Sequence, residues 1–325
     1  MVRQLAISTR FSAPSPERGR ESAVESENKR QPRTLMLPFA APYDWKSILA
    51  FFSARAIPGV DAVEGESYHR TVEVHESRGT LQVSFDGRTA SLVCSVDAPS
   101  AIDLDVVRKK LVNMFDLATD ISKVENDLSK DRYLVRLIRI RPGLRVPGGW
   151  NPFEVAVRAV LGQQISVVAA RRLAGILCAK HGKPLGGSGH PLGLTHLFPT
   201  AKTLVGAAEL GLGMPRARLE TIKWLAIAAA ENPKLFEPGV SLQASLEKLL
   251  GLRGIGEWTA NYIAMRAMRE MDAFPVKDIG ILRGAEAVIG TRPSPNDLLL
   301  QAEAWRPWRA YAAQHLWAAD SARDT

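Results

Sequence analysis

Two glycines separated by one residue, Gly254 and Gly256, lie between two amphipathic segments of the stretch 246–283. This spacing permits a tight hairpin and leaves backbone N–H groups uncovered at the start of the second helix. Exposed amides and the positive end of the helix dipole together can bind a phosphate. A tight turn that joins two helices without any ligand explains the same glycines equally well, so both interpretations stay open.

The same stretch carries two carboxylates. Asp278 follows Phe274-Pro-Val-Lys and precedes a segment with helical spacing. An aspartate in that position commonly caps a helix, which is worth about 1 kcal/mol. Asp272 is expected to lie in a loop or to act as a cap. The six histidines and two cysteines show no metal-ligand spacing, so we expect no metal site and no cofactor.

A series of helical segments surrounds these residues and begins after residue 125. Apolar residues recur there at helical spacing, and Gly and Pro punctuate the short connections. We expect helices over 125–138, 152–180, 200–209, 214–231, 241–250, 257–270, 279–288, 296–303 and 307–319.

The chain before this series mixes helices and strands. One helix is expected to start near Asp44, and another is expected over 103–117. Between them, the stretches 68–75, 79–85 and 90–96 alternate apolar and polar residues and are separated by Arg-Gly and Asp-Gly signals. That pattern predicts a meander of antiparallel strands.

These segments define an α+β fold class with two domains. We predict a small antiparallel-sheet N-terminal domain over 34–120 and an all-α domain over 121–325. Residues 1–33 are rich in Ser, Pro, Arg and Glu, and we expect them to form a disordered tail.

Composition limits the classes of protein that remain. Of the 325 residues, 46% are hydrophobic and 23% are charged, which is ordinary for a globular protein and excludes wholesale disorder. No apolar run approaches the roughly 20 residues that a membrane span needs. Two cysteines exclude a disulfide scaffold. The net charge of +8 permits a polyanionic partner without proving one.

The stretch 246–283 resembles the helix-hairpin-helix DNA-binding motif, here at about 242–268, and its continuation resembles the DNA glycosylases of the DNA-3-methyladenine glycosylase II (AlkA) type. Further motifs with this resemblance occur in the family's order along the chain: Pro42–Trp45, Ser53–Ala56, Arg141–Gly148, Leu161–Gln163 and Trp305–Trp317. The resemblance implies a helix-hairpin-helix glycosylase domain. It further implies an enzyme of base-excision repair that flips alkylated bases out of damaged double-stranded DNA and leaves an abasic site.

The resemblance implies a catalytic role for Asp278. Breaking an N-glycosidic bond develops positive charge on the sugar, and a fixed carboxylate can stabilise that charge and orient the attacking water. Catalysis and helix capping are compatible, because a helix start also fixes the side chain.

The resemblance also places Trp258, Tyr262 and Trp317 around the flipped base. Electron-rich rings attract a cationic alkylated purine. Trp258 occupies the place of the lysine with which strand-cleaving members of the superfamily form a Schiff base, so a monofunctional enzyme without lyase activity is expected. The alternative is that these aromatic residues belong only to the core.

The resemblance assigns DNA contacts to Gly254, Gly256, Gln163 and Gln164. Residues at the position of Gln164 enter the duplex and fill the gap left by the extruded nucleotide, but this wedge is often leucine in the family. The alternative for both glutamines is a solvated helix N-terminus. The hairpin carbonyl groups could hold a monovalent cation, as the family suggests.

Other functions remain possible for such a chain. The same scaffold could accept other damaged bases, such as deaminated purines, or bind damage without catalysis. We expect duplex DNA as the partner, no membrane association, no obligate protein partner and a monomer. The expected location is the bacterial cytoplasm, in association with the nucleoid.

Overall fold

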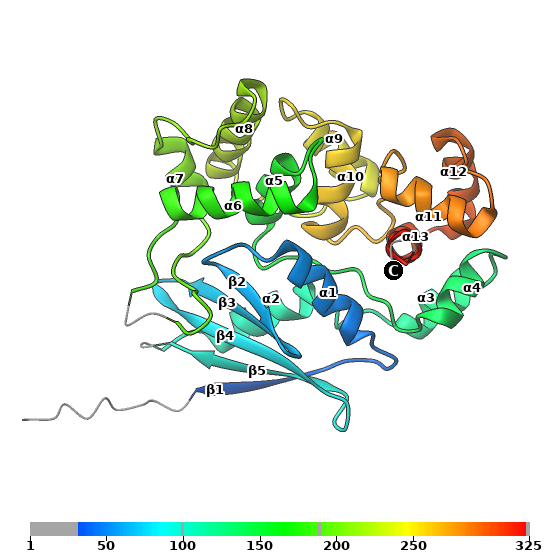
Figure 1. The fold of residues 1–325 in the computed structure, drawn as a ribbon, viewed down its shortest axis with the longest axis horizontal. Coiled ribbons are helices and arrows are strands. Elements are labelled where there is room, and N and C mark those ends of the chain that lie inside the picture. The colour runs from blue at the N-terminus through cyan, green and yellow to red at the C-terminus, as the bar shows by residue number, and fades with distance from the viewer. Residues whose placement is uncertain (1–31, 99–100, 187–189, 323–325) are drawn as a thin grey trace, which may run out of the picture. The chain divides into compact units, whose positions relative to one another are not determined.

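The computed structural model describes residues 32–98, 101–186 and 190–322. A five-stranded antiparallel sheet forms the N-terminal third of this part, and helices make up the remainder (Figure 1). The α+β fold class is therefore confirmed. The tail expected over 1–33 lies outside the described residues except for Pro32 and Arg33.

The sheet has the strand order β1-β5-β4-β3-β2, in which every neighbouring pair is antiparallel. The predicted meander corresponds to β3, β4 and β5. The short edge strands β1 and β2 are additions that the alternation pattern does not predict. The strands are β1 (Arg33–Pro38), β2 (Asp61–Glu64), β3 (Ser67–Val74), β4 (Ser77–Asp86) and β5 (Ser91–Asp97).

Two helices pack on this sheet, α1 (Trp45–Arg55) and α2 (Leu104–Met114) (Figure 1). The Asp44 carboxylate accepts a hydrogen bond from the backbone N–H of Ser47 at 3.0 Å, so the first helix starts where the sequence predicts. The buried side chains of both helices and of alternate strand positions form one hydrophobic core.

The remaining helices form a second hydrophobic core. They are α3 (Ile121–Leu128), α4 (Leu134–Ile140), α5 (Pro152–Leu161), α6 (Val167–His181), α7 (Ala201–Gly206), α8 (Arg216–Glu231), α9 (Leu242–Leu250), α10 (Glu257–Arg266), α11 (Ile279–Ile289), α12 (Pro295–Ala302) and α13 (Arg309–Ser321), with a 3-10 turn at Glu303–Trp305.

Two segments that were each predicted as one helix are divided into two helices in the structure. The segment 125–138 is divided because Asp131 accepts hydrogen bonds from the backbone N–H groups of Tyr133 and Leu134 and so starts α4 anew. The segment 152–180 is divided between α5 and α6, because Ser166 caps α6 by accepting a hydrogen bond from the Ala169 N–H at 3.2 Å.

A buried aspartate connects elements that belong to the two cores. Asp116, 3% exposed, accepts hydrogen bonds from the Tyr311 hydroxyl at 2.6 Å and the Val146 N–H at 3.1 Å, and it forms an ion pair with Arg269 at 2.8 Å. The described residues from Pro32 onward form one compact unit by their contacts. The proposed division into domains at residue 120 stays a prediction.

The described residues contain neither a candidate membrane-spanning helix nor a candidate metal-binding group. None of their helices has the length and apolar character required to cross a membrane. No group of three or more His, Cys, Asp or Glu side chains among them could hold a metal ion.

Candidate active site

The glycine pair forms the turn between α9 and α10. Gly254 has a φ of +83°, and a Cβ there would overlap the Thr221 side chain of α8, so both conformation and packing require glycine. Gly256 is the N-cap of α10, and a Cβ at that position would meet no neighbouring atom. The start of α10 thus has no side-chain cap and has open space beside it, as a phosphate site at a helix N-terminus requires.

Asp278 is the N-cap of α11. Its Oδ1 accepts hydrogen bonds from the backbone N–H groups of Gly280 at 2.9 Å and Ile281 at 3.2 Å. The predicted capping role is therefore confirmed. A capped carboxylate is held in place by the helix that it starts.

The same carboxylate also accepts hydrogen bonds from two indole rings. Trp258 Nε1, on α10, donates to Oδ2 at 2.7 Å, and Trp317 Nε1, on α13, donates to Oδ1 at 2.8 Å. Within the part of the chain that the structure describes, Oδ1 therefore has three donors and Oδ2 has one. These four donors fix the anion at the meeting point of α10, α11 and α13 and leave acceptor capacity on Oδ2.

The three aromatic residues named from the sequence lie together beside Asp278. Trp258 and Tyr262 stack with centroids 5.4 Å apart and an interplanar angle of 20°, and Tyr262 meets Trp317 edge-on at 6.5 Å and 72°. All three side chains are half-buried. Tyr262 and Trp317 also pack against the helical core, so these rings have a structural role as well.

Arg266 belongs to the same group, although it is not among the site residues predicted from the sequence. Its guanidinium carbon lies 5.0 Å from the Tyr262 ring centroid, 5.2 Å from that of Trp317 and 4.4 Å from that of Phe51 on α1. The signal that could have revealed it is the spacing of Trp258, Tyr262 and Arg266, which follow one another at four-residue intervals and so share one face of α10.

The pKa values of this group reflect its concentration of positive charge. Burial lowers the pKa of Arg266 to about 10. Burial alone would raise the pKa of Tyr262, but the guanidinium groups of Arg266, Arg55 and Arg158 outweigh that effect and lower it. The Tyr262 side of the aromatic cluster is thus electropositive, whereas Asp278 is an anion on the Trp258 side.

The two glutamines have different environments. Gln163 Nε2 donates hydrogen bonds to the Gly254 carbonyl at 3.3 Å and to Thr259 Oγ1 at 3.0 Å, which ties the α5–α6 connection to the hairpin. Gln164 is exposed and has a φ of +59°, an uncommon conformation for a residue other than glycine. Neither residue belongs to a helix N-terminus, because both precede the α6 cap at Ser166.

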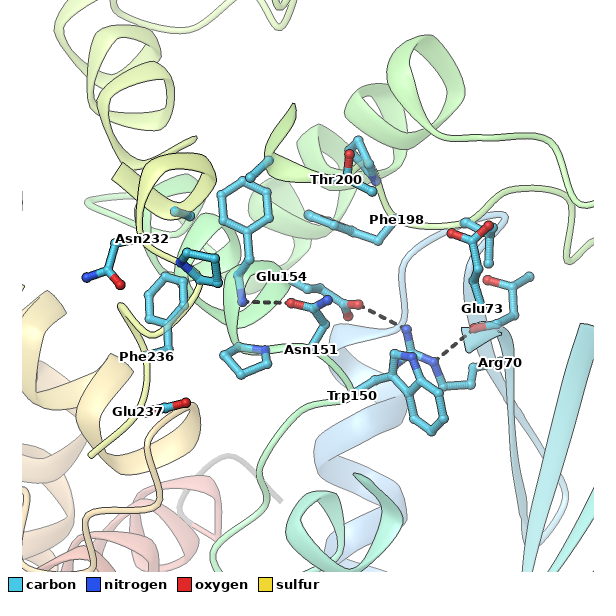
Figure 2. A pocket seen from close by; sticks show the side chains of 18 residues that line it. Arg70, Glu73, Trp150, Asn151, Glu154, Phe198, Thr200, Asn232, Phe236 and Glu237 are labelled. Carbon is cyan, nitrogen blue, oxygen red and sulfur yellow. Dashed lines mark hydrogen bonds and ion pairs between the residues drawn. The ribbon is translucent and has the colours of Figure 1, made fainter. Parts of the chain in front are cut away.

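A separate cavity of about 430 Å³ lies between β3, the start of α5 and the segments around Phe198 and Phe236 (Figure 2). Its lining includes none of the side chains around Asp278. Its buried charges are already compensated, since Glu154 forms an ion pair with Arg70 (Figure 2). The arrangement around Asp278 is therefore the better candidate for chemistry.

Comparisons with known proteins show the family of this chain. Residues 34–151 match the AlkA N-terminal domain family. DNA-3-methyladenine glycosylase 2 of Escherichia coli (strain K12) is 33% identical over 284 residues, which cover 86% of this chain and 95% of that protein.

Two further comparisons concern a longer relative and the fold. The probable bifunctional transcriptional activator/DNA repair enzyme AlkA of Mycobacterium tuberculosis (strain H37Rv) is 34% identical over 284 residues, 87% of this chain but only 56% of that protein. The chain thus spans about half the length of this relative. The structure of a 3-methyladenine DNA-glycosylase from Archaeoglobus fulgidus has the same fold, with a TM-score of 0.74 at 24% identity, over 89% of this chain and 98% of that one. On these grounds the chain belongs to the DNA-3-methyladenine glycosylase 2 (AlkA) family.

Proposed function

We propose that this chain is a monofunctional DNA glycosylase, which flips alkylated bases of the 3-methyladenine type out of duplex DNA and excises them. The observation that carries the proposal is the Asp278 carboxylate, held by the start of α11 and by the indoles of Trp258 and Trp317. The relatives of this chain include DNA-3-methyladenine glycosylases, which supports the substrate class.

The proposed chemistry places Asp278 next to the sugar. When the bond between C1′ and the base nitrogen breaks, its electron pair leaves with the base, and positive charge develops on the sugar. The fixed carboxylate stabilises that charge without reorganisation. Oδ2, which among the described residues accepts one hydrogen bond, from Trp258, has acceptor capacity left to orient the water that adds to C1′.

The hairpin would hold the DNA through a phosphate at the start of α10. An acidic residue, Glu257, directly follows Gly256, and its negative charge would oppose a phosphate. Lys277 Nζ lies 2.6 Å from Glu257 Oε2 and neutralises that charge. The pair therefore keeps the helix start available to an anion.

The aromatic cluster would receive the flipped base. Damaged bases with weakened pairing are extruded more easily, and stacking on Trp258, Tyr262 and Trp317 would select among them. An indole at the position of Trp258 cannot act as an amine nucleophile, so the product would be an abasic site with an intact strand.

Base release from methylated duplex DNA by the wild type and by Asp278→Asn tests this function. We expect the variant to release base about 10²–10³-fold more slowly while binding an abasic analogue as tightly, because the charge acts on the transition state. Strand breaks should appear only after alkali.

Asp103→Asn is the matched control, because Asp103 caps α2 by accepting from the N–H groups of Asp105 and Val106 in the same way. If both variants behaved alike, Asp278 would be only a cap. Strand breaks before alkali would contradict monofunctional action. Tight binding to the abasic analogue without any release by the wild type would favour a damage-binding protein.

A further inference from the structure

One face of α10 connects two opposite charges. Trp258 lies at one end, where its indole donates to the Asp278 carboxylate. Tyr262 stacks on Trp258 in the middle, and Arg266 follows at the other end with its guanidinium 5.0 Å from the Tyr262 ring centroid. The proposed base pocket therefore has an anion at one end and a cation at the other.

Arg266 is a buried cation whose hydrogen-bond acceptors are neutral oxygens. Its side chain is 3% exposed, and its pKa of about 10 keeps it protonated at neutral pH. It donates hydrogen bonds to neutral oxygens, the Pro147 carbonyl at 2.8 Å and Gln314 Oε1 at 3.2 Å, and the Tyr262 hydroxyl also accepts from it and partly opposes the lowering of its pKa. Its Nε is buried without a hydrogen-bond partner among the described residues.

The surroundings of Arg266 add positive charge. Arg55 and Arg269 both act on it as further cations, and of these Arg269 is paired with Asp116. Arg55 itself lies with its guanidinium carbon 4.2 Å from the centroid of Phe51, the ring that Arg266 covers at 4.4 Å. The far end of the aromatic cluster is thus a cationic wall, although it faces the rings that would attract a cationic base.

Excision of a neutral base separates charge along the line that runs from Asp278 to Arg266. The C1′–N bond breaks, its electron pair passes to the base, and the sugar becomes positive while the base becomes an anion. Water then adds to C1′ through oxygen and loses a proton, which ends on the departed base. The developing negative charge lies toward Arg266, and the developing positive charge lies beside Asp278.

On this basis, and resting on the proposed function, we propose that Arg266 is a specificity-determining residue that favours damaged bases which are neutral when bound and leave as anions. A cationic alkylated base behaves differently. It is repelled by Arg266 when it binds, and it becomes neutral as it leaves. For such a base Arg266 raises the KM and the kcat together and leaves kcat/KM nearly unchanged.

Two substitutions separate charge from packing. Arg266→Met removes the charge but keeps an unbranched side chain, and Arg266→Lys keeps the charge. The probes are duplexes with one hypoxanthine, which is neutral, or one 7-methylguanine, which is cationic. We expect Arg266→Met to lower kcat/KM for hypoxanthine about tenfold relative to that for 7-methylguanine, and to lower both KM and kcat for 7-methylguanine. Arg266→Lys should restore most of the lost kcat/KM for hypoxanthine relative to that for 7-methylguanine.

Lys110→Met is the matched control, because the Lys110 ammonium lies 5.1 Å from the ring centroid of Trp150, which is not one of the rings around Asp278. This variant should leave the ratio of the two substrates unchanged. Equal losses for both bases in Arg266→Met, without rescue by lysine, would show that Arg266 only packs the rings and would overturn the proposal.

The result for the wild type separates this inference from the proposed function. Release of 7-methylguanine without any release of hypoxanthine would overturn the role of Arg266 and leave the glycosylase proposal intact. Failure to release either base, or methylated adenine, would remove the proposed function itself.

Discussion

The Glu154 carboxylate at the start of α5 forms a 2.9 Å ion pair with the Arg70 guanidinium on β3, and each side chain is only 2% exposed. Glu154 also accepts a hydrogen bond from Arg158 at 3.1 Å. Glu154 and the buried Asp61 together compensate these two guanidinium groups between the sheet and the helical core.

Glu154→Gln should destabilise the protein by about 3–5 kcal/mol, because the substitution removes the carboxylate that is paired directly with Arg70 and leaves Asp61 to face two buried guanidinium groups. Urea unfolding at neutral pH measures this change. Glu220→Gln is the control, since Glu220 forms an exposed ion pair with Arg216 and its loss should cost at most about 1 kcal/mol. Similar losses for both variants would mean that the Glu154 cluster adds nothing through burial.

His315 should make stability depend on pH. It is 3% exposed, and burial, helped by the charge of Arg141, lowers its pKa to about 4. The unfolded chain takes up the proton near pH 6.5, so stability is complete above that pH and falls by about 3 kcal/mol as the pH decreases to about 4.

Urea unfolding between pH 7.5 and 4.5 checks this expectation. His315→Gln should reduce the pH dependence, whereas His75→Gln should retain it because the His75 side chain is 75% exposed. If the free energy of unfolding of His315→Gln changed with pH as steeply as that of the wild type, the pH dependence would belong to other groups.

Trp258→Phe should lower kcat about tenfold with little change in DNA affinity. The phenyl ring retains stacking on Tyr262, but the donor to Asp278 Oδ2 is lost. Single-turnover base release measures the effect. Trp305→Phe provides the comparison, because its indole donates to Asp131 at 2.9 Å and its loss should affect stability alone. Comparable reductions in kcat would argue against orientation of Asp278 by Trp258.

Gln164→Gly should retain stability and lose activity. Glycine adopts the φ of +59° without the steric strain that a side chain causes. This gain offsets the larger entropy cost of folding that glycine carries because it is freer in the unfolded chain. If the side chain enters the duplex, base release should fall about tenfold. Thermal unfolding and base release measure the two effects. Ala90→Gly, at φ +46° between β4 and β5, should leave both unchanged. Full activity of Gln164→Gly would exclude the wedge role.

Local signals in the sequence predicted much of this fold. The Asp44 and Asp278 caps and the meander of β3 to β5 depend on neighbouring residues, so spacing alone reveals them. The sequence did not predict the break between α5 and α6, because the run Gln163–Val168 contains no Gly or Pro. Only Gly162 precedes this run.

The residues of the candidate site likewise include some that local signals predict and one that they do not. Asp278, Trp258 and Tyr262 lie within the single stretch 246–283, and the structure brings them together with Trp317. The position of Arg266 against Phe51 arises from packing of α10 against α1, two helices far apart in the chain. No spacing rule reports such a contact, and so the cation behind the aromatic rings required the structure.

The capping role of Asp278 also bears on how this family could evolve. A residue that starts α11 must be one of the few side chains that cap well, chiefly Asp, Asn, Ser and Thr. Asn is one nucleotide change away from Asp in the genetic code, and it would preserve the helix start while removing the negative charge. Under the proposed function, a single such mutation would convert an enzyme into a folded protein that still recognises damaged DNA. Natural selection could therefore remove catalysis from this scaffold without first removing the protein.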